Sequence, residues 1–215
     1  MKPIDPIALS FMLGLLALVP IILVTCSSFL KIAVVLSLVR NALGVQQAPP
    51  NMAIYSLALL LTLYIMAPVG YEIANIAREE QDITLSVKAM VTVGRKAAEP
   101  VKNFLIKNSK PGQRQFFFNT AKKLWLPDLV ADASDTDLLI VMPAFVVSEL
   151  TTAFEIGFLL FLPFVIIDLV ISNILMAMGM MMVSPVTISL PLKLFLFVMV
   201  DGWSRLIHGL VQTYL

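Results

Sequence analysis

The chain has 215 residues, of which 59% are hydrophobic and 13% are charged, and its mean hydropathy is +0.92. This composition is too apolar for an ordinary soluble domain and is typical of membrane proteins. The formal net charge of +1 has no dominant sign, which argues against nucleic acid as a partner. The single cysteine, Cys26, excludes an internal disulfide and a cysteine-based metal cluster.

Four apolar stretches predict an all-α, membrane-type fold. They cover residues 7–39, with Lys31 inside, then residues 52–69, 138–177 and 186–200. Their lengths suit about four membrane-embedded helices. Residues 40–51 between the first two stretches are rich in Asn, Gly, Gln and Pro, which predicts a turn and an antiparallel helical hairpin. We interpret the first stretch as a retained helix and not as a cleaved signal peptide.

The charges divide the chain into three segments. Residues 71–137 hold 10 of the 15 Lys and Arg and 9 of the 14 Asp and Glu. This polar segment is expected to face water and to form two or three short helices. Residues 1–70 are predicted to form an N-terminal helical hairpin, and residues 138–215 a kinked C-terminal hairpin with a Met-rich loop. The positive-inside rule does not fix the orientation, because the polar segment is too long for the rule to apply reliably.

The run of residues 138–182 is almost wholly apolar but contains Glu149, Glu155 and Asp168. As one straight helix it would be roughly 65 Å long, about twice the hydrocarbon thickness of a bilayer. It must therefore kink, fold back or leave the membrane. Glycine and proline suggest where the helix breaks, and the predicted breaks are Gly157, Pro163, Gly179 and Pro185.

The three carboxylates are too costly to face acyl chains, at about 3 kcal/mol each, so they must face protein or water. Three roles stay open: a proton relay, an ion ligand, or pairing with cations in similar apolar settings. Those cations are Lys31, Arg40 and Lys193. Catalysis has little support, since His208 is the only histidine and no catalytic motif accompanies it. The chain is therefore predicted not to be an enzyme and to need no cofactor or metal.

The sharpest local feature is a methionine cluster formed by Met178, Met180, Met181 and Met182 around Gly179. Methionine is flexible and polarizable, so several in a loop can seal an irregular opening and still deform around varied surfaces. Hydrophobic constrictions can also close a pore by dewetting. Simple core filling is the alternative, but the position at a predicted helix end favours a gate.

A series of motifs resembles the FliP/SctR (YscR) family of type III secretion export-apparatus proteins. The motifs are SFLKI from Ser28, RNALG from Arg40, QQAPPN from Gln46, PAF from Pro143, SEL from Ser148, AFEIGF from Ala153, LPF from Leu162, Asp168, MGMMM from Met178, SLPLK from Ser189 and DGW from Asp201. They lie in both apolar ends of the chain, whereas the polar segment contributes almost nothing. The short N-terminus favours the virulence, or injectisome, branch. Ser184 stands before Pro185 where the family pattern has a second proline.

The resemblance implies a core channel subunit of the export gate, through which unfolded proteins leave the bacterial cytoplasm. Five copies would assemble as a helical ring with SctS/FliQ-type and SctT/FliR-type subunits, and an SctU/FlhB-type switch protein and the inner rod or needle are further expected partners. The multi-pass chain would belong to the bacterial inner membrane, in contact with lipid, with the assembled complex raised toward the periplasm and the polar segment periplasmic. The methionines would then form the pore gasket, and the buried charges would pair between packed helices.

One rival from another class stays open, a proton-coupled secondary transporter that uses Glu149, Glu155 and Asp168 as its relay. Such a transporter would have a solute site near the middle of the membrane and an internal repeat. We find no repeat in the sequence.

Overall fold

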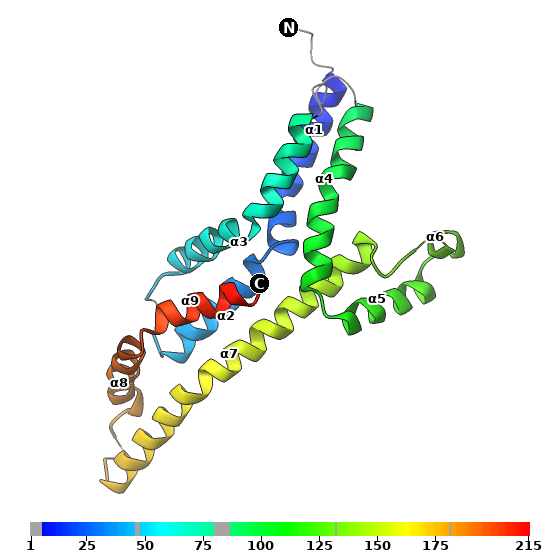
Figure 1. Cartoon of the computed structure of the whole chain (residues 1–215). Helices are drawn as coiled ribbons and strands as arrows, with labels where there is room; N and C mark the ends of the chain where they lie inside the picture. The colour runs from blue at the N-terminus through cyan, green and yellow to red at the C-terminus, as the bar shows by residue number, and fades with distance from the viewer. Residues whose placement is uncertain (1–5, 46–47, 80–86, 132, 181) are drawn as a thin grey trace. The chain divides into compact units, whose positions relative to one another are not determined.

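The computed structural model describes residues 6–45, 48–79, 87–131, 133–180 and 182–215. These residues are mostly helical and contain no β-strand, which confirms the predicted all-α fold class. The helices, shown in Figure 1, are α1 (Pro6–Thr25), α2 (Phe29–Ala42), α3 (Asn51–Glu79), α4 (Val87–Asn108), α5 (Pro111–Leu124), α6 (Pro127–Ala131), α7 (Leu138–Ala177), α8 (Pro185–Met199) and α9 (Gly202–Gln212).

Two helices among the described residues are long and apolar enough to cross a membrane, namely α7 and the stretch Asn51–Arg78 of α3. A third span results if α8 and α9, which are bent by 63° at their junction, count as one. The sequence predicted four. In the structure the first apolar stretch divides at residues 26–28 into α1, with 20 residues, and α2, which with 14 residues is short of the 20 or so that a span needs.

By its packing the chain divides into two compact units, each built from separate segments. The first unit consists of Met1–Leu30 and Thr62–Glu149, and the second of Lys31–Leu61 and Leu150–Leu215. Helices α3 and α7 each contribute to both units. This division by contacts differs from the three-segment division by composition, which remains a prediction about which parts face water and lipid.

The core of the first unit forms where the break after α1 meets α4 and the start of α7. Cys26, Leu105, Val141 and Phe145 are buried together there. The ring of Phe104 on α4 lies 5.9 Å from the ring of Phe145 on α7. Burial of these aromatic and aliphatic side chains is the main favourable term that holds the unit together.

Residues 71–79 of the polar segment belong to α3, and its other described helices are α4, α5 and α6, of which α4 has 22 residues and is longer than the short helices that the sequence predicted. The boundary between α4 and α5 lies at residues 109–110, and Pro100 lies inside α4 and does not end it. The turn between α4 and α5 is fastened to α7, because the backbone N–H of Lys110 donates to Ser148 Oγ at 2.9 Å and that hydroxyl donates to the carbonyl of Ala144 at 2.6 Å. The guanidinium of Arg114 donates to the carbonyl of Ile106 at 2.7 Å, which satisfies one carbonyl at the end of α4.

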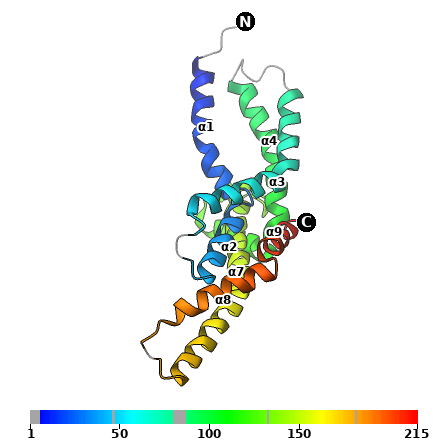
Figure 2. The ribbon, with the colours of Figure 1, turned by 90° about the vertical axis from the view of Figure 1, so that its left-hand side faces the viewer.

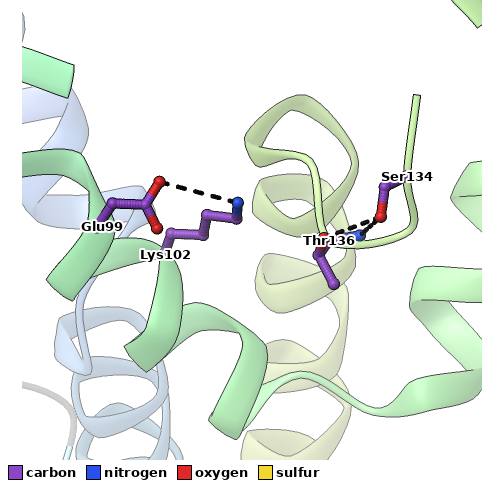
Figure 3. Close-up of polar contacts among 4 residues, drawn as sticks. All are labelled: Glu99, Lys102, Ser134 and Thr136. Atoms are coloured by element: carbon purple, nitrogen blue, oxygen red, sulfur yellow. Dashed lines mark hydrogen bonds and ion pairs between the residues drawn. The ribbon is translucent and has the colours of Figure 1, made fainter. Parts of the chain in front are cut away.

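Figure 3 shows two further polar contacts of this segment. Lys102 and Glu99 form an ion pair along α4 with 4.0 Å between Nζ and Oε1. In the turn before α7 the hydroxyls of Ser134 and Thr136 lie 2.9 Å apart. The backbone N–H of Ser134 also donates to Asp137 Oδ2 at 2.8 Å. Asp137 therefore organises the entry into α7.

The core of the second unit is built on the buried face of α2. Ile32, Leu36 and Val39 recur at helical spacing on that face and are almost fully buried. An aromatic series continues the core, because the ring of Phe197 on α8 lies 6.4 Å from Phe164 on α7 and 5.4 Å from Trp203 on α9. Figure 2 shows α8 beside the C-terminal part of α7, with α9 continuing from α8 away from that end.

Helix α7 continues without interruption through Gly157 and Pro163, so the helix breaks predicted at these two residues are wrong. An interior proline removes one backbone hydrogen bond and its ring crowds the carbonyl of residue i−4, at a cost of about 3 kcal/mol, and α7 nevertheless continues across Pro163. Gly157 serves instead for close packing, since a Cβ atom at this position would lie 2.3 Å from Leu38 Cδ1 and 3.2 Å from Leu38 Cβ. At 40 residues, α7 is roughly 60 Å long, which is about twice the hydrocarbon thickness.

Candidate functional site

The methionine cluster occupies the reversal of the chain between α7 and α8 (Figures 1 and 2). Gly179 ends α7 in the left-handed conformation, with a φ of 73°. The N–H of Met180 donates to the carbonyl of Leu175 at 2.9 Å, and the N–H of Gly179 donates to that of Met176 at 3.0 Å. These two bonds form the Schellman motif that glycine favours at a helix end. Pro185 is the first residue of α8, so Gly179 and Pro185 lie at the helix ends where breaks were expected.

The side chains of this loop point away from the unit that carries them. Met178, Met180 and Met182 are 67%, 39% and 101% exposed, while Met181 lies outside the described residues. Adjacent large apolar residues on α7 and α8 are exposed as well, among them Met176 and Val186. Exposed apolar side chains gathered near one chain reversal indicate a surface that lipid or another subunit covers. Within the single chain, these three methionines therefore do not fill the core.

A buried lysine, Lys193, joins α8 to α7, the two helices that flank this loop. Lys193 Nζ lies 2.6 Å from Asp168 Oδ2 and donates a second hydrogen bond to the carbonyl of Ala42 at 3.3 Å. The side chain of Lys193 is 6% exposed and that of Asp168 is 43% exposed. Ala42 is the last residue of α2, where the helix dipole favours a cation. One ammonium group therefore joins α2, α7 and α8.

A second buried cation, Lys31 on α2, packs against an aromatic ring. Its Nζ lies 3.7 Å from the ring centroid of Tyr214, within the range of a cation–π interaction. Both residues are buried. Sequence reasoning identified Lys31 as a buried charge but gave no signal for Tyr214, which is 183 residues away in the chain and lies just beyond α9.

The other predicted charged residues lie at different places. Arg40 donates to the carbonyl of Pro49 at 3.4 Å and to Asn51 Oδ1, so it closes the turn between α2 and α3. Glu149 is buried and belongs to the first unit, whereas Glu155 is exposed on α7 in the second. The structure therefore joins Asp168 with Lys193, and Arg40 acts within its own hairpin.

No group of three or more His, Cys, Asp and Glu side chains that could hold a metal ion occurs in the part of the chain that the structure describes. The features that stand out among the described residues are instead the exposed thioethers, the ion pair of Lys193 with Asp168, and the contact of Lys31 with Tyr214. Together with the long apolar helices, they are typical of a helical membrane protein.

The comparisons identify the family. Residues 12–210 match the model of the FliP family, and the chain belongs to that family. It is 53% identical over 211 residues to "Yop proteins translocation protein R" of Yersinia pestis, covering 98% of this chain and 97% of the relative. It is 46% identical over 214 residues to "Virulence protein YscR" of Salmonella typhimurium, covering 99% and 98%. It is 44% identical over 217 residues to "Hypersensitivity response secretion protein HrcR" of Ralstonia nicotianae, covering both chains fully.

The identification from the motifs, as a type III secretion protein of the FliP/SctR (YscR) family, is thereby confirmed. The names of these relatives describe virulence, secretion and translocation proteins and do not describe enzymes.

Proposed function

We propose that this chain is a channel subunit of the type III secretion export gate and that its methionine loop seals the closed channel. The observation that carries the proposal is the exposure of Met178, Met180 and Met182 at a chain reversal that a glycine turn terminates. Exposed methionines are costly in water and useful in a shared apolar constriction, where their flexible side chains fill gaps of changing shape.

The rest of the second unit supports such a role because it fixes the two helices that flank the loop. Lys193 holds α8 to α7 through Asp168, and to the end of α2 through Ala42. A loop whose two flanking helices are joined in this way can carry soft side chains without losing its own position. The helices on either side of the loop are then held together, while the thioethers stay deformable.

The assembly follows from the same surface. Several copies, five by family resemblance, form a helical ring with SctS/FliQ-type and SctT/FliR-type subunits, and the SctU/FlhB-type protein and inner rod or needle attach to it. The exposed apolar face of α7, which includes Phe154, Phe158 and Leu159, supports burial against neighbours. The ring belongs to the bacterial inner membrane and is raised toward the periplasm, so that the 60 Å length of α7 need not match the bilayer. Residues 71–137 are then periplasmic.

The test is small-ion leakage through the assembled complex in a bilayer. Replacing Met180, Met181 and Met182 together by alanine removes the long apolar side chains and is expected to raise the resting conductance severalfold. Met52→Ala is the matched control, because Met52 belongs to the same unit and is 80% exposed but lies at the start of α3. Unchanged conductance in an intact complex of triple-alanine chains would contradict the seal. Proton-coupled solute uptake by a monomer would instead favour the transporter.

A further inference from the structure

The second unit contains an apolar groove that the proposed seal does not use. The groove has a volume of about 260 Å³ and opens between segments of α2, α7, α8 and α9. Its walls are formed mainly by Leu160, Phe164, Leu196, Phe197 and Leu206. A groove of this volume with apolar walls accommodates part of a narrow hydrocarbon chain.

One cation lies among these apolar walls. Of the described residues that line the groove, Arg205 is the only charged one. Arg205 is exposed, and it takes part in no ion pair within the described part of the chain. The nearest carboxylate along the helix, that of Asp201, accepts a hydrogen bond from Ser204 Oγ at 3.0 Å. The guanidinium is therefore available to an anion at the side of an apolar groove.

The helix that carries Arg205 has the features of a helix at a lipid–water boundary. On α9 the residues Leu206 and Leu210 are buried, while Arg205 and His208 are exposed. The helix is bent by 63° from α8. Trp203, a residue type that favours the membrane interface, stands at its start and packs edge-to-face on Phe197 in the groove wall.

We propose that this groove binds an anionic phospholipid. One acyl chain lies against Phe164, Leu196 and Phe197, and the phosphate accepts hydrogen bonds from the guanidinium of Arg205. Arginine suits this role because its planar fork matches phosphate oxygens with two parallel hydrogen bonds and it sheds water more readily than lysine. A zwitterionic lipid offers the same chain but brings a second, positive charge close to Arg205, so the groove favours an anionic headgroup.

The test uses the fluorescence of Trp203. The chain has two tryptophans, so Trp125→Phe leaves Trp203 as the only one. The full chain, assembled with its membrane partners, is reconstituted in vesicles that contain an equal fraction of either brominated phosphatidylglycerol or brominated phosphatidylcholine. The proposal predicts severalfold stronger quenching of Trp203 by the brominated phosphatidylglycerol. It also predicts that Arg205→Gln makes the two lipids equal and that Arg95→Gln, an exposed arginine on α4, leaves the preference unchanged.

A second measurement does not depend on fluorescence. Native mass spectrometry of the complex counts the phosphatidylglycerol molecules retained per copy of the chain, and Arg205→Gln is expected to lower that number while Arg95→Gln does not. Three results would overturn the proposal: equal quenching of the wild-type Arg205 protein by both lipids, a preference that survives Arg205→Gln, or no quenching by either lipid because a neighbouring subunit covers the groove.

Discussion

Nζ of Lys193 lies 2.6 Å from Oδ2 of Asp168, and the two residues are buried to very different extents. The lysine is 6% exposed and the aspartate 43% exposed. A charge left alone in an apolar setting costs more the less water reaches it. The two halves of this pair are therefore not equivalent, and removing one partner should not cost the same as removing the other.

Asp168→Asn should accordingly destabilise the chain more than Lys193→Met. The first change replaces the carboxylate by a neutral amide and leaves a buried ammonium without its counter-charge, at a cost of about 2 kcal/mol or more. The second leaves a carboxylate that water partly reaches. The double variant should regain part of the loss, since neither charge remains. Urea unfolding in detergent, followed by circular dichroism, measures the free energies of the four proteins. A larger loss for Lys193→Met would contradict this reading.

Gly157→Ala should destabilise the chain although it lies in the middle of a helix. An added Cβ meets Leu38, and overpacking of this kind costs about 1–3 kcal/mol. Combining it with Leu38→Ala should restore part of the stability, because the space is reopened. Gly94→Ala on α4 is the matched control, since no atom lies within 4 Å of its Cβ position. That variant should be stabilised by up to about 1 kcal/mol through helix propensity.

Ser148→Ala tests the link between the polar segment and α7. The change removes the acceptor for the backbone N–H of Lys110 in a turn that water partly reaches, at a cost of about 0.5–1.5 kcal/mol. Thr120→Ala on α5 serves as control, because its hydroxyl only returns to the carbonyl of Phe116 on an exposed face. Hydrogen exchange should show faster exchange at the start of α5 in Ser148→Ala. Equal behaviour of the two variants would show that the link carries no stability.

Tyr214→Phe and Tyr214→Leu separate the ring from the hydroxyl at the contact with Lys31. Phenylalanine keeps an aromatic face beneath the ammonium and should stay close to wild type. Leucine loses the cation–π interaction, which is worth about 2 kcal/mol when the cation is desolvated. Thermal unfolding in detergent compares the two. A Tyr214→Phe protein as unstable as Tyr214→Leu would assign the stability to the hydroxyl instead.

The features that are local in sequence could be predicted. A glycine next to methionines and a proline soon afterwards marked the end of α7 and the start of α8 at Gly179 and Pro185, and the family followed from ordered motifs. The all-α class followed from composition, because long apolar stretches leave few alternatives.

The features that depend on distant residues could not be predicted. The continuation of α7 through Pro163 depends on packing along its whole length, and the role of Gly157 depends on Leu38 of another helix. The contact of Lys31 with Tyr214 joins residues that no short-range pattern connects. The split of the chain into units of separate segments has the same cause, since it reflects contacts and not composition.

Cysteine cross-linking at Met182 tests the central claim most directly. Cys26 is the only native cysteine, so a Cys26→Ser background with Met182→Cys places one thiol per chain in the loop, and Leu139→Cys, also exposed but at the start of α7, is the control. If the methionine loops of several copies meet around one closed channel, mild oxidation of the assembled complex should join Met182→Cys chains into disulfide-linked dimers. The resting conductance should not fall on oxidation, because the channel is already closed. Chains that stay monomeric under oxidation in an intact complex, with the thiol freely modified by a bulky water-soluble reagent, would show that the loops do not meet and would contradict the account.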